Sequence, residues 1–464
     1  MLDRTILGTH AGYVTSTGEP TAVPAASSDT ASAGVSRRVV AIMAVATGAV
    51  VANIYYAQPL EHTLAAQFHA STTAVGVLIT LLQLGYALGL ATLVPLGDLV
   101  ERRRLLIVLL TACAAGLLVM AAAPTLGVIA AAAVLVGMTS VAVQVIVPFA
   151  AHLAAEGQQG KVVGTVMSGL LIGILISRTV SGLLAGMVGW RWVFGLAAAV
   201  TLGMAGLLWR ELPEYRPSTR MSYPALLGSV LRLIRQEPVL RLRMVYGGLG
   251  FAAFSTFWSV SGFLLARAPY HWSETRIGLF ALLGAAGAVA ARFAGSLADR
   301  GHQRLSTAGF ALLAAASFLP LWLGGHSAIW LGAGVVLLDL GVQGLQITNQ
   351  SVIYRLAPDA RSRVNTAYMT CYFLFGTAGS GLAALVYARA GWPGVCILGA
   401  SFPLLAVLLW LVEQVRSSRG GSAAPSYADQ ADDSEQADQA GDDPSSAPAP
   451  PPAPYSVSTS PAVS

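Results

Sequence analysis

Four polar side chains lie at helical spacing within one apolar stretch of the sequence. Asp339 is followed by Gln343, Gln346 and Gln350, at offsets of four, seven and eleven residues. These offsets place the four side chains on one face of an α-helix. A carboxyl group there can take up and release a proton, whereas amides do not titrate and can hydrogen-bond an organic ligand. We interpret Asp339 as a proton-binding group and the glutamines as ligand-binding groups. The alternative is a structural carboxylate bonded between helices.

Arg178 lies in a second apolar stretch, GILISRTVSGLLAG at residues 173–186. A base in such surroundings can bind an anionic substrate or act on the ionisation of Asp339. A packing arginine that bonds backbone carbonyls is the alternative. Pairs of small residues at a spacing of four run through the same region and predict close helix packing. They are Gly169 with Gly173 and Gly182 with Gly186.

Other polar and aromatic side chains within apolar stretches are candidates to line a cavity. Aromatic rings mixed with amides suit an amphiphilic organic molecule. For each aromatic residue, lipid contact or helix packing is the alternative. The candidates are Asn53, Tyr55, Tyr56, Gln58, Gln83, Tyr86, Ser140, Gln144, Trp258, Tyr368 and Tyr372.

The elements that must position these residues are membrane-spanning helices. Of the 464 residues, 55% are hydrophobic and only 11% are charged, whereas soluble domains carry about a quarter charged residues. A spanning helix needs about 20 apolar residues. The predicted fold is an all-α membrane protein with twelve transmembrane helices. The twelve apolar segments are residues 39–60, 74–96, 104–123, 126–150, 162–187, 190–209, 244–266, 275–297, 304–324, 327–352, 364–388 and 392–412.

The segments fall into two blocks of six, which define the predicted domains. Residues 37–209 form the N-terminal six-helix bundle and residues 244–416 the C-terminal one. The loop between them, residues 210–243, is rich in Pro and Arg, and we expect one or two amphipathic helices in it along the inner membrane surface. Residues 1–36 and 417–464 are predicted disordered cytoplasmic tails, because neither composition can bury a core.

Basic residues are distributed unequally over the predicted loops. If both termini are cytoplasmic, 22 of the 27 Lys and Arg residues lie on the inner side and four on the outer side, with Arg178 inside a segment. This bias follows the positive-inside rule. We therefore predict a multi-pass protein of the plasma (inner) membrane with an even number of spans.

Two loops at corresponding places of the two blocks have similar sequences. PLGDLVERRRLL, residues 95–106, follows the second segment, and GSLADRGHQRLS, residues 295–306, follows the eighth. Asp98 and Asp299 come directly after a segment, 201 residues apart, and basic residues follow each of them. Internal repeats of this kind are typical of transporters.

These loops resemble the G-x-L-A-D-R-x-G-R-R signature of the major facilitator superfamily. The resemblance covers about residues 37–415. It implies two pseudo-symmetric six-helix bundles around a central cavity, which move by alternating access. The matching residues are Asp98, Arg102 and Arg103 in the first loop and Gly295, Leu297, Ala298, Asp299, Arg300 and Arg304 in the second.

The two loops are expected to act as conformational latches rather than substrate contacts. A loop carboxylate beside a helix start can accept backbone N–H bonds and interact favourably with the helix dipole. We expect Asp98 to face the start of the eleventh segment near Arg361 and Arg363. By the pseudo-symmetry, Asp299 should face the start of the fifth segment near Lys161.

A finer resemblance is to bacterial drug and metabolite:proton antiporters. NIYYAQPL at residues 53–60, the glycine-rich fifth segment and GWRWVF at residues 189–194 are the similar stretches. Two features depart from these exporters. Arg178 stands at the position in the fifth segment where these exporters carry a proline. The fourth segment lacks the arginine that many of them have there, and Arg178 can take over the role of that arginine.

Motifs for other chemistries are absent from the sequence. No G-x-x-x-x-G-K-[ST] or H-E-x-x-H motif occurs, so ATP does not drive this chain directly. Cys113, Cys371 and Cys396 lie in apolar stretches and predict buried thiols, not a disulfide or metal site. We predict no enzymatic activity, no cofactor, no metal, no nucleic-acid partner and no required protein partner.

The function predicted from the sequence is secondary active transport. The leading hypothesis is proton-coupled efflux of a small organic substrate across the lipid bilayer. A proton-coupled uptake symporter is the alternative within the class. A non-transporting membrane receptor on the same scaffold is the alternative from another class, although no segment is long enough for a partner-binding domain.

Overall fold

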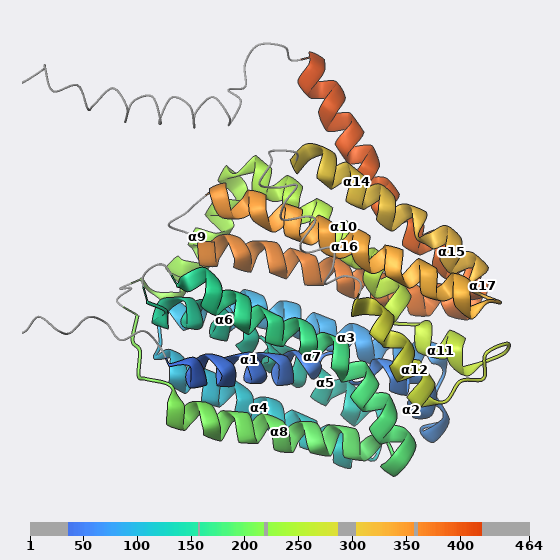
Figure 1. Cartoon of the computed structure of the whole chain (residues 1–464), viewed down its shortest axis with the longest axis horizontal. Coiled ribbons are helices and arrows are strands. Elements are labelled where there is room, and N and C mark those ends of the chain that lie inside the picture. Colours follow the sequence, from blue (N-terminus) through green and yellow to red (C-terminus); the bar gives the residue numbers. More distant parts are fainter. Residues whose placement is uncertain (1–35, 156–157, 218–220, 286–302, 357–360, 420–464) are drawn as a thin grey trace, which may run out of the picture. The chain divides into compact units, whose positions relative to one another are not determined.

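The computed structural model describes residues 36–155, 158–217, 221–285, 303–356 and 361–419 (Figure 1). Within these ranges the chain forms helices and no strand, as predicted. The first elements are α1 (Arg37–Ala52), η1 (Gln58–Leu60), α2 (Glu61–Gln67), α3 (Thr72–Thr92), η2 (Val94–Asp98), α4 (Arg102–Ala122), α5 (Leu126–Ser140), α6 (Ala142–Leu153), α7 (Gln159–Val188), α8 (Trp190–Glu211) and α9 (Tyr223–Gln236). They are followed by α10 (Pro238–Trp258), α11 (Ser261–Ala266), α12 (Glu274–Phe280), η3 (Ala281–Ala285), α14 (Gln303–Ala316), α15 (Phe318–Leu323), α16 (Ala328–Leu356) and α17 (Arg361–Arg419).

Helical structure coincides with the predicted membrane segments. Among the described residues, nine helices are long and apolar enough to cross a membrane. The last of them contains two predicted segments, which meet at Gly391, where φ is 61°. The first segment is made of α1 with η1, and α12 with η3 covers the first half of the eighth. The rest of the eighth segment and both predicted tails except their innermost residues lie outside the described residues.

The described chain divides into two compact units. Residues Met1–Val407 form the first unit, and Leu408–Ser464 form the second, of which the structure describes the last residues of α17. All contacts discussed below belong to the first unit.

Several helices begin at side chains that satisfy the first backbone N–H groups. Ser71 accepts a hydrogen bond from the N–H of Ala74 at the start of α3, and Thr125 does the same for Val128 at the start of α5. Serine and threonine are among the residues that cap helices best. α7 ends at Val188 and is followed by Gly189, whose φ of 95° would strain a residue with a side chain, and α8 begins at the next residue.

Glycines allow α1 and α7 to pack with their backbones in contact. A Cβ atom on Gly169 would lie 2.1 Å from the backbone oxygen of Ala44, and one on Gly173 would lie 2.2 Å from that of Gly48. Such distances exclude any side chain at these two positions. The close packing predicted from the Gly169–Gly173 pair is therefore confirmed, and it follows the small-residue rule for membrane helices.

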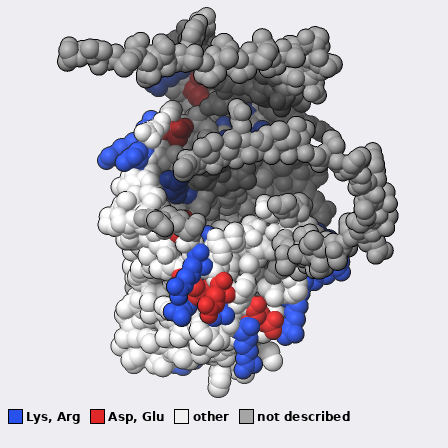
Figure 2. Space-filling model, turned by 90° about the vertical axis from the view of Figure 1, so that its left-hand side faces the viewer, with Lys and Arg blue, Asp and Glu red and all other residues white. Residues whose placement is uncertain are grey.

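The outer surface of the helices carries large apolar side chains. Examples are Val108, Met187, Trp192, Leu319 and Ile329, each more than 60% exposed. An apolar surface of this extent is not tolerated in water and fits contact with lipid tails. Charged side chains of both signs lie close together on the face that Figure 2 shows. The structure contains the ion pairs Arg38–Glu211 and Arg103–Glu214, each at 2.6 Å.

We name the two ends of the molecule after residues that lie there. α3 runs for 21 residues, about 30 Å, between α2 at one end and η2 at the other. The end with η2 carries Asp98 and is called the Asp98 end. The opposite end, where Thr63 of α2 donates a hydrogen bond to Glu274 of α12, is called the Glu274 end.

The loop predicted at residues 210–243 contains one described helix, α9. Its Tyr223 hydroxyl donates to the backbone oxygen of Thr92 at 2.8 Å, and Leu226 is buried. The next helix, α10, begins at Pro238, six residues before the predicted start of the seventh segment. Proline suits the first helical turn, and Arg241 and Arg243, assigned to the loop from the sequence, belong to this helix. The helix therefore begins more than one turn before the predicted apolar segment.

Candidate functional site

A cavity of about 110 Å³ lies where α7, α10, η3 and α16 meet. Its polar lining consists of Arg178, Trp258, Asp339 and Gln343. Its remaining walls are apolar and include Leu171, Leu175 and Phe254. The two apolar stretches singled out in the sequence for their isolated charges, the fifth and the tenth, thus meet at one cavity.

Arg178 is held in this cavity by an amide and two aromatic rings. It is 4% exposed, and its Nε donates a hydrogen bond of 2.6 Å to Oε1 of Gln58. Its guanidinium carbon lies 4.5 Å from the ring centre of Tyr55 and 4.4 Å from that of Trp258. Such cation–π contacts stabilise a desolvated guanidinium. The Nη2 atom of Arg178 has no hydrogen-bond partner.

Asp339 faces the same space from α16. It is 3% exposed, and its Oδ2 atom has no hydrogen-bond partner. A Cβ atom on Gly284 of η3 would lie 3.1 Å from this Oδ2 and 3.6 Å from Cζ2 of Trp258, so the carboxylate and the indole border the same point. No hydrogen bond or ion pair within 4.0 Å joins Asp339 to Arg178, whose Nε is directed at Gln58 instead.

The four polar residues on one face of α16, Asp339, Gln343, Gln346 and Gln350, do not share the same surroundings. Gln343 lines the cavity with Asp339. One turn further on, Gln346 accepts a hydrogen bond of 2.9 Å from the hydroxyl of Tyr372, and Gln350 lies near Sδ of Met369 at 3.9 Å. The helical face predicted from the spacing is therefore present, but only its first two members border the described cavity.

Three other candidates form contacts between the two blocks of helices toward the Asp98 end. Gln83 accepts a hydrogen bond from Ser255 at 3.4 Å. Tyr86 packs on Phe373, with ring centres 4.3 Å apart. Gln144 accepts a hydrogen bond of 3.4 Å from Asn365. These side chains lie at the surface where the blocks meet, not in the cavity itself.

The remaining candidates have other surroundings. Asn53 donates to Cys113 at 3.4 Å and to Thr201 at 3.3 Å, and Ser140 lies 3.6 Å from the same cysteine, so both belong to a polar cluster inside the first block. The backbone oxygen of Tyr56 accepts from Ser181. Tyr368 is fully buried against Gly247.

At the Glu274 end, α7 packs directly on α12. Thr179 donates a hydrogen bond of 2.8 Å to the backbone oxygen of Gly278. A Cβ atom on Gly182 would lie 2.2 Å from the backbone oxygen of Glu274. The second predicted pair, Gly182 and Gly186, therefore allows α7 to pack closely on α12 of the other block. Gly169 and Gly173, in contrast, allow α7 to pack on α1 of its own block.

At the Asp98 end, the first signature loop contacts the start of α17. Oδ2 of Asp98 accepts from the hydroxyl of Ser362 at 3.5 Å, and its Oδ1 pairs with Arg102 at 3.3 Å. Asp98 therefore lies beside the start of α17, where it contacts Ser362, the residue between the expected neighbours Arg361 and Arg363. In the second loop, Gly295, Asp299 and Arg300 lie outside the described residues. Arg304 is described and exposed on α14.

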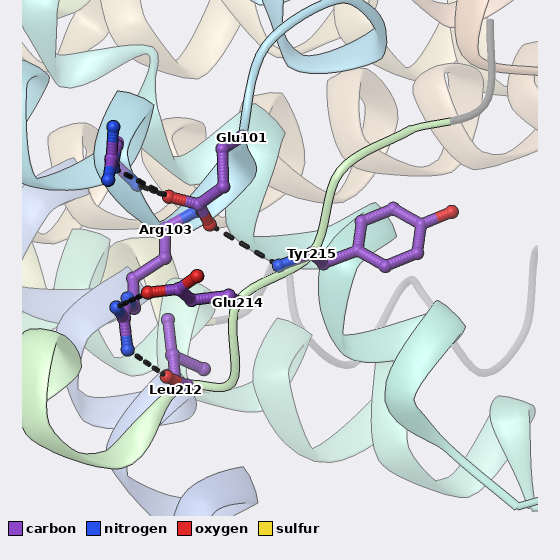
Figure 3. Close-up of polar contacts among 6 residues, drawn as sticks. Glu101, Arg103, Leu212, Glu214 and Tyr215 are labelled. Atoms are coloured by element: carbon purple, nitrogen blue, oxygen red, sulfur yellow. Dashed lines mark hydrogen bonds and ion pairs between the residues drawn. The ribbon is translucent and has the colours of Figure 1, made fainter.

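The chain that follows α8 folds back onto the first signature loop (Figure 3). Arg103 donates to the backbone oxygen of Leu212 at 3.1 Å and pairs with Glu214 at 2.6 Å. Glu101 accepts from the backbone N–H groups of Arg103 and Arg104, both at 2.8 Å, and from that of Tyr215 at 3.3 Å. Glu101 thus caps α4 and also binds the segment after α8 through the backbone of Tyr215. We call this set of contacts the Glu101 clasp.

Replacement of Glu101 by Ala should lower the stability of the protein. Loss of a helix cap costs about 0.5–2 kcal/mol, and here the bond to Tyr215 is lost as well. The measurement is the apparent melting temperature of the purified protein in detergent. Glu214→Ala is the matched control, because Glu214 is 60% exposed and an exposed ion pair contributes about 1 kcal/mol or less. Equal melting temperatures for Glu101→Ala and wild type would contradict the capping role.

Glu61 was missed as a candidate, because the sequence placed it at the end of a segment. The structure buries it completely, and neither carboxylate oxygen has a hydrogen-bond partner. A Cβ atom on Gly262 of α11 would lie 3.1 Å from its Oε2, so Glu61 lies at a contact between the blocks. The signal available in the sequence was its offset of three from Gln58, which places both on one helical face.

Similar proteins of known class support the assignment of this fold. The uncharacterized transporter YgaY of Escherichia coli O157:H7 is 47% identical over 371 residues, which cover 80% of this chain and 94% of YgaY. The probable transporter SCO4007 of Streptomyces coelicolor is 33% identical over 406 residues, 86% of this chain and 93% of that protein.

Solved structures share the fold at low sequence identity. A bacterial homolog of the human lysosomal transporter Spinster, inward-facing and occupied, aligns with a TM-score of 0.67 and 13% identity over 84% of this chain and 98% of that chain. The nucleoside transporter NupG aligns with a TM-score of 0.64 and 12% identity over 80% and 99%.

Fold, cavity and relatives together define a multi-pass membrane transporter that works by alternating access, and not an enzyme. A sequence model described as Major Facilitator Superfamily matches residues 40–380 and, in a second match, residues 251–452. The chain belongs to the Major Facilitator Superfamily.

Proposed function

We propose that this transporter exports a small organic solute in exchange for protons, with Asp339 as the group that carries the proton. The observation that supports this most directly is the buried Asp339 carboxylate, which has an unpartnered oxygen in a cavity shared with Arg178. Ionisable side chains within a membrane are costly to maintain and are usually functional.

The coupling follows from the shared cavity. When the cavity opens to one side, water reaches Asp339 and the carboxyl group exchanges a proton with that side. Arg178 acts on the proton occupancy of Asp339 through its positive charge. Because Arg178 bonds Gln58 and not Asp339, the carboxylate stays available to a proton or a substrate.

The direction of transport rests on the resemblance of the fifth and sixth segments to those of exporters. Uptake together with protons uses the same groups and is the alternative. Everted membrane vesicles with an imposed pH gradient, acid inside, distinguish the two. Substrate accumulation in these vesicles and acceleration of proton loss by added substrate are expected for an exporter. Accumulation only in right-side-out vesicles would show uptake instead.

We propose that the protein lies in the plasma (inner) membrane with its Asp98 end facing the cytoplasm. A cysteine introduced for Ala225, an exposed residue of α9, should not react with an impermeant thiol reagent on intact cells. A cysteine in place of Arg276, exposed at the Glu274 end, is the control and should react. Labelling of residue 225 from outside would invert the proposed topology.

The signature loop is proposed to be a latch that sets the rate of conformational change. Asp98→Asn weakens the pairing with Arg102 and the contact with Ser362 without touching the cavity. We expect slower turnover at nearly unchanged substrate affinity, measured as initial rates against substrate concentration in vesicles. Abolished binding in a folded Asp98→Asn protein would refute the latch. Asp299 is proposed to have the same role in the second loop.

A further inference from the structure

Two side chains of opposite charge face the cavity without completing their hydrogen bonds. Nη2 of Arg178 is a buried donor without a partner, and Oδ2 of Asp339 is a buried acceptor without one. The indole of Trp258 borders the same point. Buried polar groups in proteins are nearly always hydrogen-bonded, so two such atoms on side chains of opposite charge in one cavity require an explanation.

The two charges do not satisfy each other. Arg178 uses its Nε on Gln58 at 2.6 Å and its Nη1 on the backbone oxygen of Ile174 at 3.5 Å. Its guanidinium is fixed between the rings of Tyr55 and Trp258. A ligand with one anionic and one cationic group would supply both missing partners, whereas an ion of a single sign would leave one side chain unpaired.

We propose that the cavity binds a compact zwitterion, whose carboxylate bonds Arg178 and whose ammonium group bonds Asp339. This inference rests on the proposed function, since it names the substrate class of the same site. A guanidinium suits a carboxylate because its N–H donors are arranged in a planar fork. Oδ2 of Asp339 can accept one of the three N–H groups of an ammonium.

The size and walls of the cavity restrict the rest of the molecule. A cavity of about 110 Å³ is smaller than the engineered cavity of about 150 Å³ that admits benzene. Only a few carbon atoms therefore fit beside the two charged groups. Leu171, Leu175 and Phe254 line the space and favour an alkyl side chain. Small neutral amino acids have this composition.

The same geometry explains how export would be linked to protons. The ammonium group of the substrate and the proton require the same carboxylate of Asp339, so they bind in alternation. Protonation of Asp339 removes the charge that holds the ammonium group and favours release of the substrate on the side that supplies protons. Arg178 keeps its charge throughout and holds the carboxylate of the substrate.

Isothermal titration calorimetry on the purified full-length protein tests the proposal without any pH gradient. The probes are glycine, L-alanine and L-valine, each compared with its amide, which lacks the anion, and its N-acetyl derivative, which lacks the cation. We expect at least one amino acid to bind about tenfold or more tightly than either of its derivatives, as for the loss of one charged hydrogen bond.

Two variants assign each charge to its side chain. Arg178→Gln should remove the preference for the amino acid over its amide, and Asp339→Asn should remove the preference over the N-acetyl derivative. Arg191→Gln and Glu214→Gln, both outside the cavity, are the matched controls and should keep both preferences. Melting curves of all four variants establish that they are folded.

Two outcomes overturn the proposal. One is that no amino acid of the panel binds to the wild-type protein. The other is that a derivative with a single charge binds as tightly as its parent. Neither outcome affects proton coupling, which the vesicle experiment measures separately. Conversely, zwitterion binding without substrate-dependent proton flux would retain the substrate class and refute the proposed coupling.

Discussion

Membrane vesicles carrying Asp339→Asn should fail to accumulate substrate under a pH gradient. The amide preserves the size and polarity of the side chain but cannot bind a proton, so the gradient no longer drives the cycle. Exchange of external for internal substrate needs no net proton movement and should persist at saturating substrate. The measurement is uptake of labelled substrate with and without the gradient, at equal protein content.

The controls separate titration from structure. Asp339→Glu keeps an ionisable group in the cavity and should retain part of the pH-driven accumulation. Gln343→Leu changes a neighbouring lining residue without altering the number of titratable groups and should leave the coupling to protons intact. Accumulation against the substrate gradient by Asp339→Asn vesicles would return Asp339 to a structural role between helices.

Gly182→Val should hold the Glu274 end open. The backbone oxygen of Glu274 would lie 2.2 Å from the new Cβ atom, and Cα of Gly278 would lie 3.1 Å away. Backbone atoms cannot move aside as a flexible side chain can, so α7 and α12 must separate. Overpacking costs about 1–3 kcal/mol, which shifts the equilibrium between closed and open forms about 5- to 150-fold.

Reactivity of a buried position measures this shift. A cysteine in place of Thr179, which is 9% exposed between α7 and α12, should react faster with a soluble thiol reagent when Gly182→Val is present. Substrate transport should fall in parallel. Gly164→Val is the matched control on the same helix, because nothing lies within 4 Å of its new Cβ atom. Unchanged thiol reactivity in the Gly182→Val protein would show that this contact does not close the Glu274 end.

The sequence predicted the membrane helices and the two charged residues in the cavity, because membrane burial requires long apolar segments and makes a charge within such a segment easy to recognise. Apolar length alone marks a spanning helix, and an isolated charge inside one, such as Arg178 or Asp339, is conspicuous. The structure adds that both border the same cavity, which spacing along single helices cannot show. It also shows that two of the aromatic candidates, Tyr55 and Trp258, pack on Arg178.

Predictions failed where a helix did not continue as assumed. α1 ends at Ala52, and residues 53–60 form turns and η1. Asn53 therefore points into the first block, toward Cys113 and Thr201, while Gln58 reaches Arg178. A regular helix through this stretch could not be told apart from these turns by composition. For the same reason Glu61 was assigned to a segment end, although it is buried between the blocks.

The Glu101 clasp has a mechanical consequence for the loop between the blocks. Tyr215 is fastened to Glu101, and Tyr223 is fastened to Thr92. Both hydrogen bonds join the loop to the first block, so we expect α9 to move together with that block. α9 joins α10 at Glu237, which follows α9, precedes α10 and has extended backbone angles. Arg241 of α10 also donates hydrogen bonds to the backbone oxygens of Ile234 and Arg235 in α9, at 3.1 Å and 2.5 Å. Because this connection is short and hydrogen-bonded, we expect the second block to rotate about Glu237 rather than to slide far along the first.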